Sequence, residues 1–251
     1  MGAPELRIIG LGGLPDVKSG DDVAAMICEA AERQGTPPAA GDVLIVTQKI
    51  VSKAEGRVVD LAEVEPGAEA LRLAEETDKD PRLVELILKE SRRIVRQVGP
   101  VLITETRHGF VCANAGIDAS NVSEGYVALL PEDPDRSAVG IRDALRERTG
   151  LKVPVIISDT FGRPWREGHT NVAVGVAGME VFVDYVGQTD PYGNELRVST
   201  LAVADELAAA AELVMGKLSG VPVAIVRGYE YPKGCGTARD IVRPPERDLF
   251  R

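Results

Sequence analysis

The sequence predicts a compact α+β fold, in which mixed sheets are flanked by helices. Short β-branched runs such as VLIVT and VPVIIS are typical of buried strands, and they alternate with longer runs whose apolar spacing is typical of helices. No repeat, linker or change of composition divides the 251 residues, and a chain of this length buries about three quarters of its surface as one unit. We therefore expect a single domain over residues 1–251, with room for two intertwined subdomains.

The first expected elements are a helix over residues 20–35 and a strand after it. The helical segment has an apolar face, begins with aspartates that can cap it and ends at a glycine. The run GDVLIVTQKIVSK then predicts a buried strand, which leads into a polar end carrying Lys49 and Lys53.

A second helix is predicted over residues 80–99. Asp80 can cap it, Pro81 suits the first helical position, and Gly99 follows the last turn. The next run, VLITETRHGFVCANAG, predicts a β-hairpin with His108 in a surface turn.

The C-terminal half is predicted to contain two further helices, each followed by a strand. A helix over residues 135–150 leads into the strand VPVIISD, with Asp159 at the carboxyl end of that strand. An alanine-rich helix over residues 198–217 is separated by Pro222 from the strand VAIVRG. The order of the strands in the sheets stays open at this point.

Composition excludes several classes of function. The formal net charge is -10, which repels a polyanion, and we find neither a basic stripe nor many aromatic residues, so no nucleic-acid partner is expected. No apolar run approaches the roughly 20 residues that span a bilayer. Three scattered cysteines suggest a reducing compartment. We expect a cytoplasmic protein.

The glycine-rich stretch GLGGLPD does not match the known phosphate-binding fingerprints. A dinucleotide fingerprint that begins at Gly10 requires a third glycine where Pro15 stands, and the expected helix begins only near Asp21. A Walker A sequence is also absent. The sequence therefore predicts neither a Rossmann nor a P-loop fold.

Two aspartates stand in loops of small residues. Asp118 with Asn121, and Asp159 with Thr160, offer the short oxygen donors that Mg²⁺ or Mn²⁺ prefers. An alternative interpretation is that each aspartate only caps backbone amides. Because both loops follow strands, we favour a shared cation site.

Basic side chains accompany these loops. Lys49, Lys53 and Arg57 form one cluster, and Arg163 and Arg166 form another. On an acidic chain such clusters suit an anionic substrate, for example a nucleotide triphosphate or a polycarboxylate. The alternative is that they are solvated surface charges in ion pairs.

Several blocks in one order resemble the coenzyme F420-0:L-glutamate ligase family: VTQKIVSKAEGR, ANAGIDASN, ISDTFGRPWREG, DPYGNEL and ADELAAAAELVMGK. The resemblance runs from about Gly13 to about Gly228. It implies an enzyme, an amide ligase outside the ATP-grasp and P-loop folds, that joins L-glutamate in γ-glutamyl linkage to the deazaflavin coenzyme F420-0. The resemblance further implies GTP as co-substrate, Mn²⁺ or Mg²⁺, assistance from K⁺, and a homodimer.

The resemblance also implies roles for individual residues. Asp118, Asp159 and Thr160 would hold the metal, and Asp118, Asp159 and Lys53 would be catalytic. The residues expected to bind GTP are Leu14, Pro15, Asp16, Val17, Gln48, Lys53 and Asn121. We add Arg163 and Arg166 as candidates for binding substrate carboxylates or the phosphodiester of the coenzyme. The substrate carboxylate would attack GTP to give an acyl phosphate, which the amine of glutamate would then open.

The chain departs from some relatives in two respects. Lys217 stands where some relatives place an acidic metal ligand, which leaves the metal count open. We expect no nitroreductase-like domain of the kind that is fused to some actinobacterial relatives. The competing interpretations are a non-catalytic nucleotide- or metabolite-binding module, a ligase for a different carboxylate, and a nicotinamide or flavin oxidoreductase, which the failed glycine fingerprint weakens.

Overall fold

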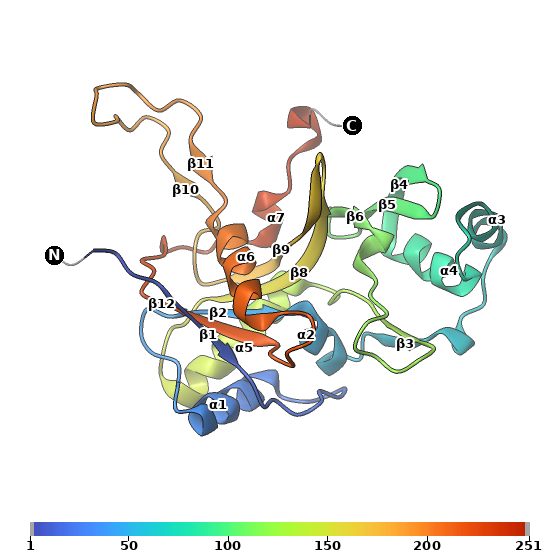
Figure 1. Ribbon diagram of the computed structural model, residues 1–251, viewed down its shortest axis with the longest axis horizontal. Helices are drawn as coiled ribbons and strands as arrows, with labels where there is room; N and C mark the ends of the chain where they lie inside the picture. The colour runs from blue at the N-terminus through green and yellow to red at the C-terminus, as the bar shows by residue number, and fades with distance from the viewer. Residues whose placement is uncertain (1–2, 249–251) are drawn as a thin grey trace.

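A computed structural model describes residues 3–248 and confirms the α+β fold (Figure 1). Its centre is a five-stranded sheet with the strand order β1-β12-β2-β8-β9. The strands are β1 (Arg7–Leu11), β12 (Val223–Arg227), β2 (Val43–Thr47), β8 (Val155–Arg163) and β9 (Arg166–Ala177). The pair β2 and β8 is parallel, whereas the other neighbours are antiparallel.

Three long helices cover the two faces of this sheet. One face carries α6 (Val203–Met215), and the other carries α1 (Val23–Gln34) and α5 (Pro134–Thr149), as Figure 1 shows. Since both faces are covered, Val43 to Val46 in the central strand are at most 1% exposed. The expected caps are confirmed in α1, where the Asp22 carboxylate accepts from the Ala25 amide at 2.9 Å and Gly35 is left-handed.

A smaller lobe packs beside the central sheet and has its own apolar core. It contains α3 (Ala68–Thr77), α4 (Pro81–Glu90) and a three-stranded sheet of β4 (Ser91–Val98), β5 (Val101–Thr106) and β6 (Val111–Ala113). The predicted hairpin is therefore confirmed as β5 and β6.

Short elements connect the lobe to the central sheet and complete the chain. They are α2 (Gln48–Ala54), the paired strands β3 (Val58–Asp60) and β7 (Tyr126–Ala128), the hairpin β10 (Val183–Asp184) and β11 (Thr200–Leu201), α7 (Ala238–Ile241), and the 3₁₀ turns Leu61–Glu63, Asn114–Gly116 and Pro245–Arg247.

The prediction of one helix over residues 80–99 is wrong beyond Glu90. The helix begins as expected, with Asp80 as cap and Pro81 in the first turn. It ends where Ser91 becomes extended and its hydroxyl donates to the Ile87 carbonyl at 2.6 Å. The following residues form β4, because pairing with β5 satisfies their backbone groups and suits β-branched side chains such as Ile94.

Two strand predictions near the edge of the central sheet also need correction. The strand expected to carry Lys49 and Lys53 stops at Thr47, and both lysines lie on α2. Asp159 does not end a strand, because β8 continues to Arg163 and forms a long hairpin with β9. A register shift between Ile157 and Ser158 interrupts this hairpin just before Asp159.

Two smaller expectations differ from the structure. The alanine-rich helix begins at Val203, five residues later than expected, because Thr200 and Leu201 pair with β10. His108 lies in the hairpin turn, but its ring is half-buried and stacks on Phe110. Its Nε2 atom lies 3.1 Å from the carbonyl oxygens of Pro131 and Glu132.

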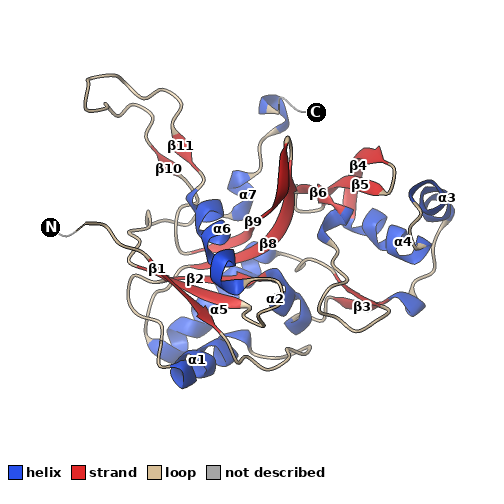
Figure 2. Ribbon diagram, viewed as in Figure 1, coloured by secondary structure: helices blue, strands red, loops and turns tan. Residues whose placement is uncertain are grey.

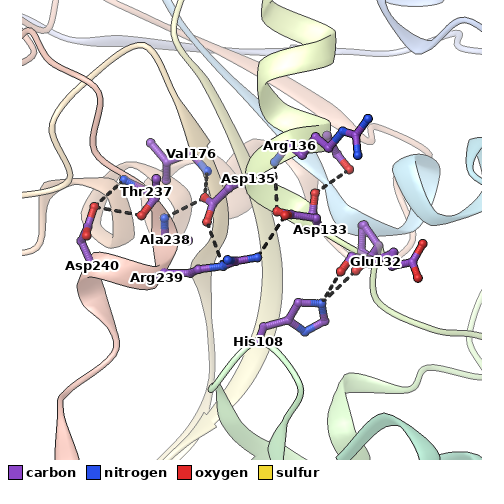
Figure 3. Close-up of polar contacts among 12 residues, drawn as sticks. His108, Glu132, Asp133, Asp135, Arg136, Val176, Thr237, Ala238, Arg239 and Asp240 are labelled. Carbon is purple, nitrogen blue, oxygen red and sulfur yellow. Dashed lines mark hydrogen bonds and ion pairs between the residues drawn. The ribbon is translucent and has the colours of Figure 1, made fainter.

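The C-terminal segment is fastened to the start of α5 beside His108 (Figure 3). The Asp135 carboxylate accepts from the backbone amides of Val176 and Ala238, both at 2.8 Å. Arg239 pairs with Asp133 at 3.0 Å. These contacts join β9, α5 and α7.

The hairpin of β10 and β11 projects from the body as a long arm, most of which is loop (Figure 2). Its outer residues are exposed, including Tyr192 at 91% and Val198 at 89%. None of the helices that the structure describes has the length and apolar character needed to cross a membrane.

Candidate active site

Most of the predicted site residues come together in one cleft of about 390 Å³. The cleft lies between the loop after β1, α2, the loop after β6, the middle of β8 and the turn after α6. It is lined by ten residues that the sequence singled out: Leu14, Pro15, Asp16, Val17, Gln48, Lys53, Asp118, Asn121, Asp159 and Thr160.

The parallel pair β2 and β8 positions the centre of this cleft. Thr47 is in register with Ser158, so the residues that follow them, Gln48 and Asp159, lie at the same edge of the sheet. In α/β sheets the carboxyl ends of parallel strands are the usual place for a ligand. β2 ends there, whereas β8 passes the site and continues into its hairpin.

Asp118 is held by a lysine and a serine. Its Oδ2 atom lies 2.8 Å from Nζ of Lys49, and its Oδ1 atom accepts from the Ser120 amide at 2.6 Å. The same ammonium also donates to the Ser120 hydroxyl at 2.7 Å. Burial opposes ionisation, but the bonds from Lys49 and Ser120 outweigh it and hold the pKa of Asp118 below its usual range. Asp118 is thus a fixed, ionised carboxylate.

Asp159 has the opposite environment. Burial raises the pKa of its carboxyl to about 7, and the charge of Asp118 adds to this effect. The Thr160 amide, which donates to Oδ1 at 2.8 Å, lowers the pKa only in part. The two carboxylates therefore lie within electrostatic reach of each other. The charges of Lys217 and Lys49 also lower the pKa of Asp159, but neither lysine forms an ion pair with it in the described residues. A cation bound between the two carboxylates would favour the ionised form of Asp159.

The donor set fits a hard divalent cation that also binds phosphate. In residues 3–248 there is no group of three or more His, Cys, Asp and Glu side chains able to hold a metal ion. Mg²⁺ is commonly bound by one or two carboxylates together with water and substrate phosphates, and it does not require such a group. Asp118 and Asp159 supply those two carboxylates.

A chain of hydrogen bonds extends from Thr160 across the floor of the cleft. Its hydroxyl donates to Oδ1 of Asn171 at 2.8 Å and accepts from Nζ of Lys217 at 3.0 Å. Nδ2 of Asn171 donates to Glu212 at 3.0 Å. Asn171 and Glu212 were not predicted from the sequence as site residues, and Lys49 was predicted only as part of a basic cluster. Only the β8–β9 register, which places Asn171 opposite Thr160, brings the first of them here.

The nucleotide-binding candidates line the other side of the cleft. Nζ of Lys53 lies 2.7 Å from a carboxylate oxygen of Asp16. Gln48 is 1% exposed, and its Oε1 atom accepts from the Ser52 hydroxyl at 2.8 Å. Its Nε2 atom is buried and has no partner in the described part of the chain, so a ligand in the cleft could accept this hydrogen bond.

Arg163 and Arg166 lie apart from the cleft, at the exposed tip of the β8–β9 hairpin. The guanidinium of Arg163 donates to the Glu167 carbonyl at 2.6 Å.

A second cavity, of about 690 Å³, adjoins the cleft and shares Asp16, Val17, Lys53 and Asn121 with it.

Comparison with known proteins identifies the family of this chain. Residues 13–228 match the family model for F420-0:gamma-glutamyl ligase. The chain belongs to that family. It is 50% identical to the coenzyme F420:L-glutamate ligase of Methanothermobacter thermautotrophicus, with 98% of this chain and 99% of the relative covered. It is 51% identical to the ligase of the same name from Methanopyrus kandleri, covering 100% and 99% respectively. The corresponding Methanocaldococcus jannaschii enzyme is 42% identical, at 98% and 97% coverage.

Membership of the F420-0:gamma-glutamyl ligase family confirms the resemblance found in the sequence blocks. It also favours a ligase over the binding module and the oxidoreductase.

Proposed function

We propose that this protein is a GTP-dependent ligase that joins L-glutamate to coenzyme F420-0 through an amide bond, with γ-glutamyl linkage for any further glutamates. Relatives named coenzyme F420:L-glutamate ligase align with nearly the whole chain. The structural observation that carries the proposal is that two carboxylates and several ammonium groups share one cleft.

The chemistry needs activation of a carboxylate, which is a poor electrophile. In the proposed reaction a carboxylate oxygen of the coenzyme attacks the terminal phosphorus of GTP, giving an acyl phosphate and GDP. The glutamate amine then attacks the acyl carbon and loses a proton. The bond between that carbon and the phosphate oxygen breaks, which releases phosphate. We assign nucleotide binding to Lys53 and to Nε2 of Gln48, which has no partner in the described residues; both line the cleft, and both suit the electrostatic demands of phosphoryl transfer.

Asp118, Asp159 and Thr160 would hold Mn²⁺ or Mg²⁺. Such an ion supplies neutralisation of the phosphate charge. Assistance from K⁺ remains a prediction, as do the cytoplasmic location and the absence of a nucleic-acid partner. Arg163 and Arg166 remain candidates for the coenzyme only if the hairpin tip meets it outside the cleft.

We also propose that the chain works as a homodimer. The arm of β10 and β11 exposes Tyr192 and Val198 almost fully, and Val186 is 50% exposed. These apolar side chains are not buried by the rest of the chain, and contact with a second copy would bury them.

Mass spectrometry of the deazaflavin tests the ligase directly. Purified protein is incubated with coenzyme F420-0, L-glutamate, GTP and Mn²⁺, and each component is omitted in turn. We expect a product heavier by one or more glutamyl residues only in the complete mixture. Asp159→Ala should fold and give no product. Bound GTP without any product from the native chain would instead indicate the binding module or a different carboxylate substrate.

A further inference from the structure

The lysines of the cleft differ in how they are paired. Lys49, Lys53 and Lys217 all line it. Lys49 forms an ion pair with Asp118 at 2.8 Å, and Lys53 forms one with Asp16 at 2.7 Å. Lys217 forms no ion pair with the carboxylates that the structure describes; its hydrogen bond goes to the neutral hydroxyl of Thr160. The charge of Lys217 is therefore available to an anionic ligand.

The turn after α6 directs Lys217 into this position. The helix ends at Gly216, which has a positive φ of 57°. The Ser219 hydroxyl donates to the Met215 carbonyl and fastens the turn to the helix. Nζ of Lys217 then lies 3.0 Å from the Thr160 hydroxyl, one residue from Asp159.

The bonds at Thr160 decide which cation can stand beside it. Its hydroxyl gives its hydrogen to Asn171 and accepts from Lys217. A metal ion bound to the same oxygen atom would lie close to the ammonium group of Lys217, and the two positive charges would repel each other. In the described part of the chain Lys217 forms no hydrogen bond or ion pair with Asp118 or Asp159, although its charge acts on Asp159 and lowers the pKa of that carboxyl.

We propose that Lys217 supplies the positive charge at Thr160 in place of a second divalent cation, so that each chain binds one divalent ion, on Asp118 and Asp159. This inference rests on the proposed function. It narrows the metal ligands to the two aspartates, and it makes Lys217 a ligand for the phosphate that is transferred.

Counting bound metal tests the inference without any turnover. Native chain is dialysed to equilibrium against Mn²⁺ and a non-hydrolysable βγ-imido analogue of GTP, and bound Mn²⁺ is measured by elemental analysis. We expect one ion per native chain. In Lys217→Glu a carboxylate replaces the ammonium beside Thr160, and we expect two ions and the magnetic-resonance signal of a coupled Mn²⁺ pair. Lys152→Glu, an exposed lysine outside the cleft, should retain one ion.

A second variant covers the case in which Lys217→Glu does not fold. Lys217→Met removes the charge and adds no ligand, so it should bind the analogue about tenfold more weakly by calorimetry. The inference would be overturned by any of three results. These are two ions on the native chain, one ion on folded Lys217→Glu, or an unchanged affinity of Lys217→Met for the analogue. Failure of the native chain to bind the analogue at all would instead overturn the proposed function.

Discussion

At the scale of single residues, the cleft shifts the pKa values of its two aspartates in opposite directions. Bonds from Lys49 and Ser120 keep the pKa of Asp118 low, whereas burial raises the pKa of Asp159 to about 7. A pair of carboxylates whose pKa values are pushed apart is typical of a site that handles charge. Here a bound cation would offset the free-energy cost of ionising Asp159.

This cost predicts how the stability of the metal-free protein changes with pH. A carboxyl whose pKa is raised by folding contributes stability at low pH, and this contribution is lost as pH rises from about 4 through about 7. Asp159→Asn has no such titration. We therefore expect the melting temperature of the variant to rise relative to the native chain across that window and to level off near pH 8. Thermal unfolding in a series of chelator-treated buffers measures the two melting temperatures. A difference between them that stays constant with pH would contradict the prediction.

At the scale of elements, close approaches between segments fix how α5 lies on the sheet. A Cβ atom at Gly175 in β9 would lie 2.3 Å from the carbonyl oxygen of Pro134 at the start of α5. This contact is with backbone, so relief requires that the helix move away from the sheet. The same helix start carries Asp135, which joins β9 to α7.

Two glycine substitutions in these elements should have opposite signs. Gly175→Ala should lower the free energy of unfolding by about 2 kcal/mol or more, because the added methyl group overpacks the contact with Pro134. Gly140→Ala, within α5, meets nothing within 4 Å, and it should raise that free energy by about 1 kcal/mol through helix propensity. Chemical denaturation compares the two variants; equal effects would refute this description of the packing.

Elements with strong end signals could be predicted from the sequence, and elements decided by distant partners could not. Asp22 and Gly35 mark the ends of α1 within the segment itself. The apolar spacing of Ile94 continues the helical period of α4, so local pattern alone could not show that pairing with β5 makes this segment a strand. In the site, Asp118 and Asp159 were recognisable as short oxygen donors, although Asp159 lies within β8 and not in a loop. Asn171 and Glu212 were not, because only folding brings Asn171 to Thr160 and Glu212 to Asn171.

At the scale of the whole molecule, the arm of β10 and β11 projects away from the central sheet (Figure 1). The cleft draws its residues from segments that are distant in sequence, from Asp16 to Lys217. The arm contributes no residue to it. Assembly and cleft geometry can therefore be tested by separate substitutions.

The arm predicts an effect on association. Replacing Tyr192 and Val198 by serine removes two large exposed apolar side chains, and we expect a dimer to become a monomer, or to dissociate at much lower concentration. Light scattering coupled to size exclusion gives the mass of each species. Leu71→Ser, an exposed leucine in the smaller lobe, is the control. A dimer of undiminished stability in the double variant would move the interface away from the arm.

The central claim is that this cleft activates a carboxylate as an acyl phosphate, and an oxygen label tests it most directly. Coenzyme F420-0 carrying ¹⁸O in its carboxylate is converted in the presence of L-glutamate, GTP and Mn²⁺, and the released phosphate is analysed by mass spectrometry. Because the C–O bond breaks when the amine displaces phosphate, we expect one ¹⁸O atom per phosphate released. Unlabelled phosphate, with the displaced ¹⁸O atom found in guanosine monophosphate or in water, would contradict the account.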